Sequence, residues 1–189
     1  MVANMSKKKL NNFILLPLFL GAVTLVAAGA LTGVHLLTKP KIEENIKHKQ
    51  LSGYKAVLDL AQSDVIDLKK ETVSDELAGI GVTNKFSVTI DTTLVGVVYD
   101  AEITGYNSGL IFQVGFKGTK YAGFNVISSN ETPGYGADYL ETVHKQIEGV
   151  EIGDPILQDP SKTGKTITAN ALRKALEACA TDYLEGRAG

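Results

Sequence analysis

Three threonine hydroxyls and a glycine lie directly before the last apolar segment of the chain, in the sequence TGKTIT. The six residues are Thr163, Gly164, Lys165, Thr166, Ile167 and Thr168. From Ala169 to Leu184 apolar residues recur at helical spacing, so the threonines stand at the start of a predicted helix. Hydroxyls at that position commonly cap free backbone amides, and the same amides favour a bound phosphate. The segment is therefore suited to capping, to phosphate binding, or to both.

A nucleoside triphosphate site is excluded for this segment by its spacing. The phosphate-loop pattern GxxxxGK[ST] would need a glycine at position 159, where the chain has Asp159. The residues before Gly164 also form a loop with two prolines rather than a strand. We therefore reject nucleoside triphosphate binding here.

A second segment, ETPGYG, combines a carboxylate, a hydroxyl and an aromatic ring with glycines. Its residues are Glu131, Thr132, Pro133, Gly134, Tyr135 and Gly136. The Pro-Gly pair fits a type II turn, which on its own predicts an ordinary loop between a strand and a helix. Glycines also allow a ligand to approach the backbone closely, and Tyr135 offers a flat face for an aromatic ring. The composition of the segment leaves both interpretations open.

Charge and cysteine content exclude several classes of function. Residues 40–189 hold 15 of the 19 basic residues and all 21 acidic residues, which gives this part a net charge of −6. That acidity argues against a nucleic acid as partner. Cys179 is the single cysteine of the 189-residue chain, so an intrachain disulfide and a cysteine-ligated metal site are excluded. We expect no metal site, Cys179 in core packing, and His144 on a helix surface.

The stretch from Phe13 to Leu37 contains 25 residues without a formal charge. A helix of that length spans roughly 37 Å, and the hydrocarbon core of a bilayer is about 30 Å thick. The run is longer than the apolar part of a cleaved signal peptide. Lys7, Lys8 and Lys9 precede it and favour a cytoplasmic N-terminus. We predict a cytoplasmic segment at 1–12, an uncleaved transmembrane signal anchor at 13–37, and everything after it outside the cytoplasm.

The remaining residues predict a single α+β domain. An amphipathic juxtamembrane helix is expected over 38–62. The polar stretch 63–81 is expected to connect this helix to the first predicted strand and to contain at most one short strand. Alternating apolar residues and short turns predict an antiparallel meander with strands at 86–90, 94–104, 110–116 and 121–127. Helices at 137–144 and 169–184 complete an extracytoplasmic domain over 63–189, with an antiparallel sheet and flanking helices.

In this order and spacing, the two glycine-containing segments resemble the motifs of the FMN-binding domain family. That family includes the G subunit of the Rnf electron-transport complex and the C subunit of the sodium-pumping NADH:quinone reductase. Residues 131–136 match its motif ETPG-hydrophobic-G, with Tyr135 where leucine is common and Ser129 where a histidine often precedes it. Residues 163–168 match S/T-G-A-T-x-T, with Lys165 in place of alanine. Asp159 lies seven residues before Thr166, where an aspartate six residues before is usual.

The resemblance extends beyond these motifs and carries a function with it. The stretch 38–42 resembles the family's junction after the membrane anchor, and Gly105-Tyr106 resembles its hairpin. By similarity, Thr166 carries FMN through a phosphoester that a separate flavin transferase installs, and the isoalloxazine ring rests against residues 131–136. Lys165 would then place a positive charge beside the phosphate. No catalytic residue is expected on this chain, because its work would be electron transfer.

The family implies a cell-membrane, single-pass subunit of an Rnf-type ion-translocating ferredoxin:NAD oxidoreductase, with the other membrane subunits as partners. Two alternatives within the same class are a C-type subunit of the sodium-pumping NADH:quinone reductase and a stand-alone extracellular flavin carrier. An alternative of a different class is a membrane-anchored binding or scaffold protein without flavin. The replacement of alanine by Lys165 keeps this last alternative open.

Overall fold

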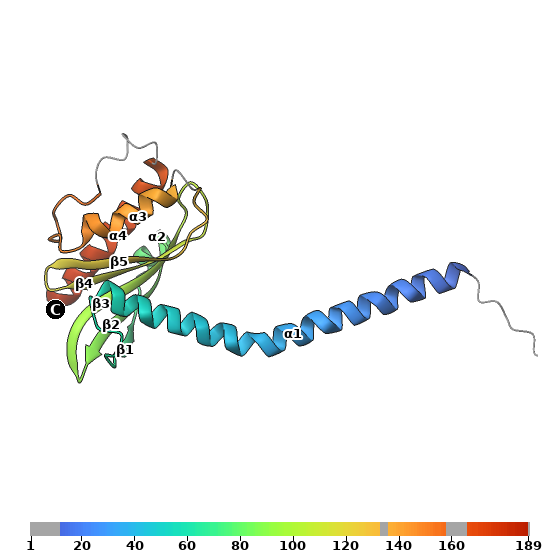
Figure 1. Ribbon diagram of the computed structural model, residues 1–189. Coiled ribbons are helices and arrows are strands. Elements are labelled where there is room, and N and C mark those ends of the chain that lie inside the picture. Colours follow the sequence, from blue (N-terminus) through green and yellow to red (C-terminus); the bar gives the residue numbers. More distant parts are fainter. Residues whose placement is uncertain (1–11, 133–135, 158–165, 189) are drawn as a thin grey trace, which may run out of the picture. The chain divides into compact units, whose positions relative to one another are not determined.

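The computed structural model describes residues 12–132, 136–157 and 166–188 (Figure 1). The chain divides into two compact units, residues 1–47 and 48–189, and each is considered by itself. The first helix, α1 (Asn12–Val57), begins in the first unit and ends in the second. The second unit holds the sheet and the other helices.

In the first unit, the described large apolar side chains of α1 are exposed. They are Leu18, Phe19, Leu20, Val23, Leu25, Val26 and Leu31. Among the helices of the described residues, none combines the length and the apolarity that crossing a membrane requires. The membrane span predicted over residues 13–37 is therefore not confirmed.

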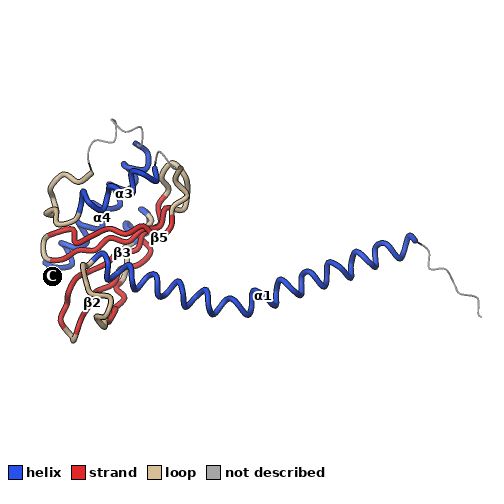
Figure 2. Tube along the Cα trace, viewed as in Figure 1, coloured by secondary structure: helices blue, strands red, loops and turns tan. Residues whose placement is uncertain are grey.

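The second unit contains a five-stranded antiparallel sheet whose strands lie in chain order (Figures 1 and 2). Its strands are β1 (Asp67–Glu71), β2 (Val82–Ile90), β3 (Thr93–Ile103), β4 (Leu110–Lys117) and β5 (Lys120–Ser128). Between β4 and β5 the chain reverses at Gly118, whose φ of 65° suits a residue without a side chain. The α+β class and the antiparallel sheet predicted from the sequence are confirmed, and β1 lies in the stretch where one short strand was expected.

Three helices of the second unit pack against one face of the sheet: α2 (Asp75–Ile80), α3 (Gly136–Ile147) and α4 (Thr166–Ala188). Alternation along β4 directs Phe112 and Phe116 into the core that these helices share. Cys179 is fully buried in the same core, as predicted, and burial raises the pKa of its thiol above the ordinary value. The short helix α2 was not predicted; the Ser74 hydroxyl caps it by accepting a hydrogen bond from the Leu77 amide.

The opposite face of the sheet is covered by the last turns of α1. Val57 and Leu58 are fully buried there. Glycines on the strands permit this close approach, since a Cβ at Gly115 or Gly123 would lie only 2.8 Å from the Val57 carbonyl oxygen. The amphipathic helix predicted over 38–62 corresponds to the C-terminal part of α1, which ends at Val57, and its last turns pack against the sheet.

A buried carboxylate also fixes this end of α1. Asp100, on β3, is 4% exposed and accepts hydrogen bonds from the Tyr54 hydroxyl at 2.7 Å and from Gln113 Nε2 at 3.0 Å. Burial first, and then the neighbouring Asp100, raise the pKa of Tyr54 above its ordinary value, so the phenol remains a donor. The polar contacts therefore supplement the apolar packing in positioning α1.

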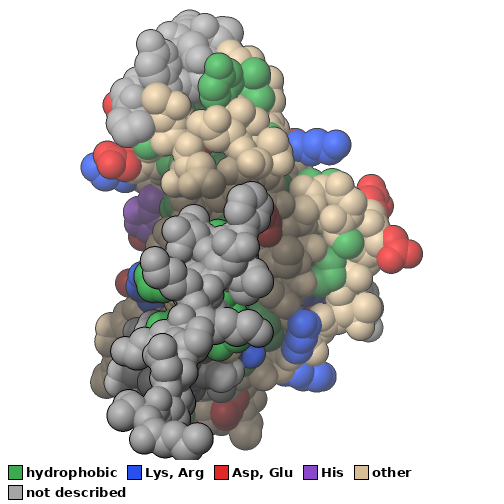
Figure 3. Space-filling model, turned by 90° about the vertical axis from the view of Figure 1, so that its right-hand side faces the viewer, with side chains coloured by type: hydrophobic (Ala, Val, Ile, Leu, Met, Phe, Trp, Pro, Cys, Tyr) green, Lys and Arg blue, Asp and Glu red, His purple; other side chains and the backbone are tan. Residues whose placement is uncertain are grey.

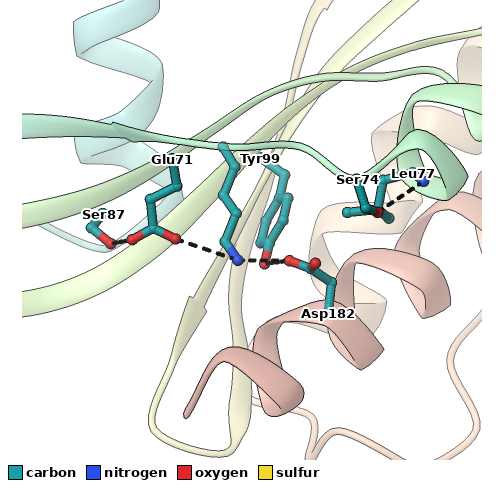
Figure 4. Close-up of polar contacts among 7 residues, drawn as sticks. Glu71, Ser74, Leu77, Ser87, Tyr99 and Asp182 are labelled. Carbon is teal, nitrogen blue, oxygen red and sulfur yellow. Dashed lines mark hydrogen bonds and ion pairs between the residues drawn. The ribbon is translucent and has the colours of Figure 1, made fainter. Parts of the chain in front are cut away.

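Charged and polar side chains fix the far end of α4. The ammonium group of Lys85, which is 8% exposed, lies 2.7 Å from Asp182 Oδ2 and 3.4 Å from Glu71 Oε2 (Figure 4). The Tyr99 hydroxyl donates to the same Asp182 oxygen at 2.7 Å. Burial lowers the pKa of Lys85, but the hydrogen bonds and charges of Asp182 and Glu71 together outweigh it and raise the pKa. These contacts hold the C-terminal half of α4 against β1, β2 and β3.

Candidate functional site

Three segments distant in the sequence meet at one end of the sheet: the β3–β4 hairpin (104–109), the residues after β5 (129–132), and the first turn of α4. Antiparallel pairing brings the end of β3, the start of β4 and the end of β5 to the same end of the sheet. The helices α3 and α4 begin beside that end of the sheet (Figure 1). Both motif-bearing segments of the sequence reach this place.

Thr168 joins α4 to the hairpin. Its side chain is 2% exposed, and its Oγ1 accepts a hydrogen bond of 3.0 Å from the backbone amide of Tyr106, 62 residues earlier. Gly105 allows this approach, because a Cβ there would lie 2.8 Å from Thr168 Oγ1 and would also clash with the carboxylate of Glu131. The packing of helix, hairpin and loop therefore requires glycine at position 105.

Glu131 joins the loop to the hairpin from the other side. Its side chain is 7% exposed, and its Oε1 accepts a long hydrogen bond of 3.4 Å from the Asn107 amide. Its own amide donates to Ser129 Oγ at 3.1 Å. A Cβ at Gly136, the first residue of α3, would clash with the second carboxylate oxygen. Glu131 is thus an internal link between the hairpin, the residues after β5 and the start of α3.

Two asparagines strengthen the contact between hairpin and loop. Asn107 Nδ2 donates to the Asn130 carbonyl at 2.9 Å, and Asn130 Nδ2 donates to the Ser108 carbonyl at 3.1 Å. The hairpin is therefore held by side chains and backbone groups of both neighbouring segments.

The two described threonines of the TGKTIT segment have different environments. Thr166, the first residue of α4, is exposed, whereas Thr168 is buried and engaged by the hairpin. In the other segment, Thr132 is exposed, and its carbonyl accepts a hydrogen bond from the Ala137 amide at the start of α3. The structure therefore gathers Glu131, Gly136 and Thr168, with Thr166 on the same turn as Thr168. The remaining predicted site residues lie outside the described residues: Pro133, Gly134, Tyr135, Thr163, Gly164 and Lys165.

An open pocket of about 360 Å³ adjoins the link residue Glu131, between β5 and α3. Apolar, neutral polar and titratable residues line it: Phe124, Asn125, Val126, Ser129, Glu131, Ala137, Leu140, Glu141 and His144. On the rim, His144 Nδ1 lies 3.1 Å from the Phe124 carbonyl and His144 Nε2 lies 3.3 Å from Glu148. The imidazole is 46% exposed, which confirms its prediction as a helix-surface residue.

The hairpin residues are the part of this site that sequence reasoning did not identify as a site. The sequence predicted only a short turn between the strands at 94–104 and 110–116, and Gly105-Tyr106 resembled the family's hairpin without a role of its own. The contacts of the hairpin use the backbone amides of Tyr106 and Asn107, and no residue type marks such an amide in a sequence. The clearest signal was a glycine directly before an aromatic residue in a turn.

On the face shown in Figure 3, acidic and basic side chains lie scattered among hydrophobic side chains, other side chains and backbone. Within the described ranges, no group of His, Cys, Asp and Glu side chains is arranged to hold a metal ion. The described polar groups at the site are hydroxyls, amides and one buried carboxylate, which are groups that can bind and orient an organic ligand.

Comparison with known families gives one match. Residues 18–57 match the family model described as the RnfG N-terminal region, and this supports an RnfG-like family for the chain. The matched residues lie within α1 and precede every residue of the candidate site. No curated protein matches the chain.

Proposed function

We propose that this chain is an electron-carrier subunit of an Rnf-type membrane complex and that it carries FMN joined to Thr166 through a phosphoester. The observation that carries the proposal is the contrast between two hydroxyls on the first turn of α4. Thr166 is exposed, while Thr168 is buried and accepts a hydrogen bond from the hairpin. Only the first is accessible to a flavin transferase. The match of residues 18–57 to the RnfG N-terminal region supports the complex.

The residues at this end of the sheet fit a phosphate-linked group. Thr166 begins a helix of 23 residues, and the free amides and dipole of a helix N-terminus favour an anion. Gly105 and Gly136 bring three segments into contact without side chains of their own. When bound, FMN supplies one- and two-electron transfer. The task of the chain is then to hold the group and to shape its surroundings.

The proposal includes the partners and the location. The partners are the other membrane subunits of the complex and, during maturation, a flavin transferase. The uncharged stretch 13–37, preceded by three lysines, favours an N-terminal anchor with the sheet domain outside the cytoplasm. Alkaline phosphatase fused after Gly189 should be active in bacterial cells, and the chain should resist carbonate extraction from membranes. A fluorescent GFP fusion at the same position would contradict this topology.

The attachment site is tested by co-expressing the full chain with a flavin transferase, denaturing it and measuring its mass and in-gel fluorescence. We expect the mass of one FMN on the wild-type chain and none on Thr166→Val. Thr181→Val is the control, since it removes an exposed hydroxyl of the same helix outside the TGKTIT segment and should leave the chain labelled. An unlabelled wild-type chain would refute the proposed function, and a label that survives Thr166→Val would refute the site.

A further inference from the structure

We propose that the ring of Tyr106 is a contact residue for the isoalloxazine ring of the flavin carried by Thr166, so that the β3–β4 hairpin forms a wall of the site. This inference rests on the proposed function. It assigns a role to a segment outside both sequence motifs. It rests on two observations: the backbone of Tyr106 is held by hydrogen bonds, whereas its side chain is exposed.

The backbone around Tyr106 is held firmly. Its amide donates to the buried Thr168 hydroxyl at 3.0 Å. The next amide, of Asn107, donates to Glu131, and the Asn107 side chain donates to the Asn130 carbonyl at 2.9 Å. The Gly105 amide closes the turn by donating to the Asn107 carbonyl at 3.1 Å. The position of Tyr106 is therefore fixed by groups from α4 and from the loop after β5.

The ring of Tyr106 is nevertheless 71% exposed. Every other tyrosine within the described residues is at most 5% exposed: Tyr54, Tyr99, Tyr121, Tyr139 and Tyr183. A large aromatic ring on a well-ordered backbone has little reason to remain in water, because burying it would be favourable. An exposed ring on a fixed backbone is suited to contacting a flat apolar group.

Position favours the flavin as that group. The first turn of α4 carries both the hydroxyl proposed to bear FMN and the hydroxyl that holds the Tyr106 backbone. The ribityl chain of FMN separates its phosphate from its ring by several flexible bonds. A ring joined to Thr166 through this chain would be within reach of the hairpin, because the hairpin contacts the same turn of α4. A partner protein that covers Tyr106 instead is the alternative that the experiment must separate.

Fluorescence lifetime of the covalently bound flavin tests the contact. A phenol ring touching an excited flavin quenches it by transient electron donation, and a phenylalanine ring does not. The chain contains no tryptophan, so tyrosines are its main aromatic quenchers. Because the family resemblance also places Tyr135 near the ring, lifetimes are compared in a Tyr135→Phe background. There we expect a short-lifetime component that is strongly reduced when Tyr106→Phe or Tyr106→Leu is added. Iodide should reach the flavin several-fold more readily in Tyr106→Leu, which has lost the ring, than in Tyr106→Phe.

Tyr183→Phe is the matched control. Tyr183 lies 17 residues beyond Thr166 on α4, roughly 25 Å away, and its loss should leave the lifetime unchanged. Mass spectrometry of each variant reports FMN attachment separately, so a wild-type chain without FMN refutes the proposed function and not this contact. A flavinylated chain whose lifetime is unaffected by both Tyr106 variants overturns the inference. The inference is equally overturned if Tyr106→Leu lowers only co-purification with the other subunits of the complex.

Discussion

The two ends of α4 are held by different chemistry. At the C-terminal end, the ammonium of Lys85 is enclosed between two carboxylates and shares Asp182 with the Tyr99 hydroxyl. At the N-terminal end, Thr168 and Glu131 accept hydrogen bonds from backbone amides of the hairpin. The far end pairs its polar groups with one another. At the site end, residue Thr166 and the Tyr106 side chain are exposed.

This difference indicates that the C-terminal end of α4 serves mainly stability, whereas its N-terminal end serves mainly the proposed function. Charge-assisted hydrogen bonds between partly buried groups at the far end anchor the helix to three strands. The site end uses neutral donors and close glycine packing, which fix backbone positions while leaving reactive groups accessible. Changes at the two ends should therefore separate unfolding from flavin attachment.

The largest expected loss of stability comes from the far end. Asp182→Ala leaves the ammonium of Lys85 with Glu71 alone and should lower the free energy of unfolding by about 2–3 kcal/mol, measured by urea unfolding followed by circular dichroism. FMN attachment at a permissive temperature should be unchanged. Glu185→Ala, an exposed acid on the same turn, is the control and should change stability by less than about 0.5 kcal/mol. Equal effects of the two variants would contradict a special role for Asp182.

A Cβ added at the site end should lower both stability and FMN attachment. Gly105→Ala introduces a methyl group that clashes with Glu131 and lies 2.8 Å from Thr168 Oγ1, so it should separate the hairpin from α4 at a cost of about 1–3 kcal/mol. FMN attachment, measured by mass, should fall as well. Gly79→Ala is the matched control: a Cβ at this helical glycine meets nothing within 4 Å, and the change should stabilise by up to about 1 kcal/mol. Normal flavinylation of Gly105→Ala would argue against the hairpin as part of the site.

Removing a single acceptor sharpens the comparison further. Thr168→Val deletes the oxygen that accepts the Tyr106 amide and should cost about 1 kcal/mol in unfolding free energy. Because Thr166 is untouched, FMN should still attach. The short fluorescence lifetime should weaken, since the hairpin loses its bond to α4. A lifetime identical to wild type would mean that this bond does not position Tyr106.

The smallest effect is expected at Lys165. Its side chain would add a positive charge near the proposed phosphate, where the family usually has alanine. Lys165→Ala should leave the attachment complete and lower the flavin midpoint potential slightly, because a nearby cation stabilises the reduced, more negative flavin. Spectroelectrochemical titration of the full chain measures this shift. An unchanged potential would show that Lys165 does not act on the flavin.

Much of the fold could be predicted because its signals are local. Alternation and turn glycines located β2, β3, β4 and β5 within a few residues, and helical spacing located α3 and α4. Strand β1 was only allowed for, because its sequence DLKKE is mostly polar and carries little alternation. Helix α2 has six residues, fewer than two turns, so no periodicity could identify it.

The site divides in the same way. The sequence by itself determined that a cluster of threonines begins the last helix and that glycine-containing segments precede both α3 and α4. Only the tertiary structure decided that Thr168 turns inward while Thr166 stays exposed, and that Glu131 binds a backbone amide of the hairpin. The physical reason is that burial and amide contacts depend on segments up to 62 residues apart, which the fold brings together at one end of the sheet.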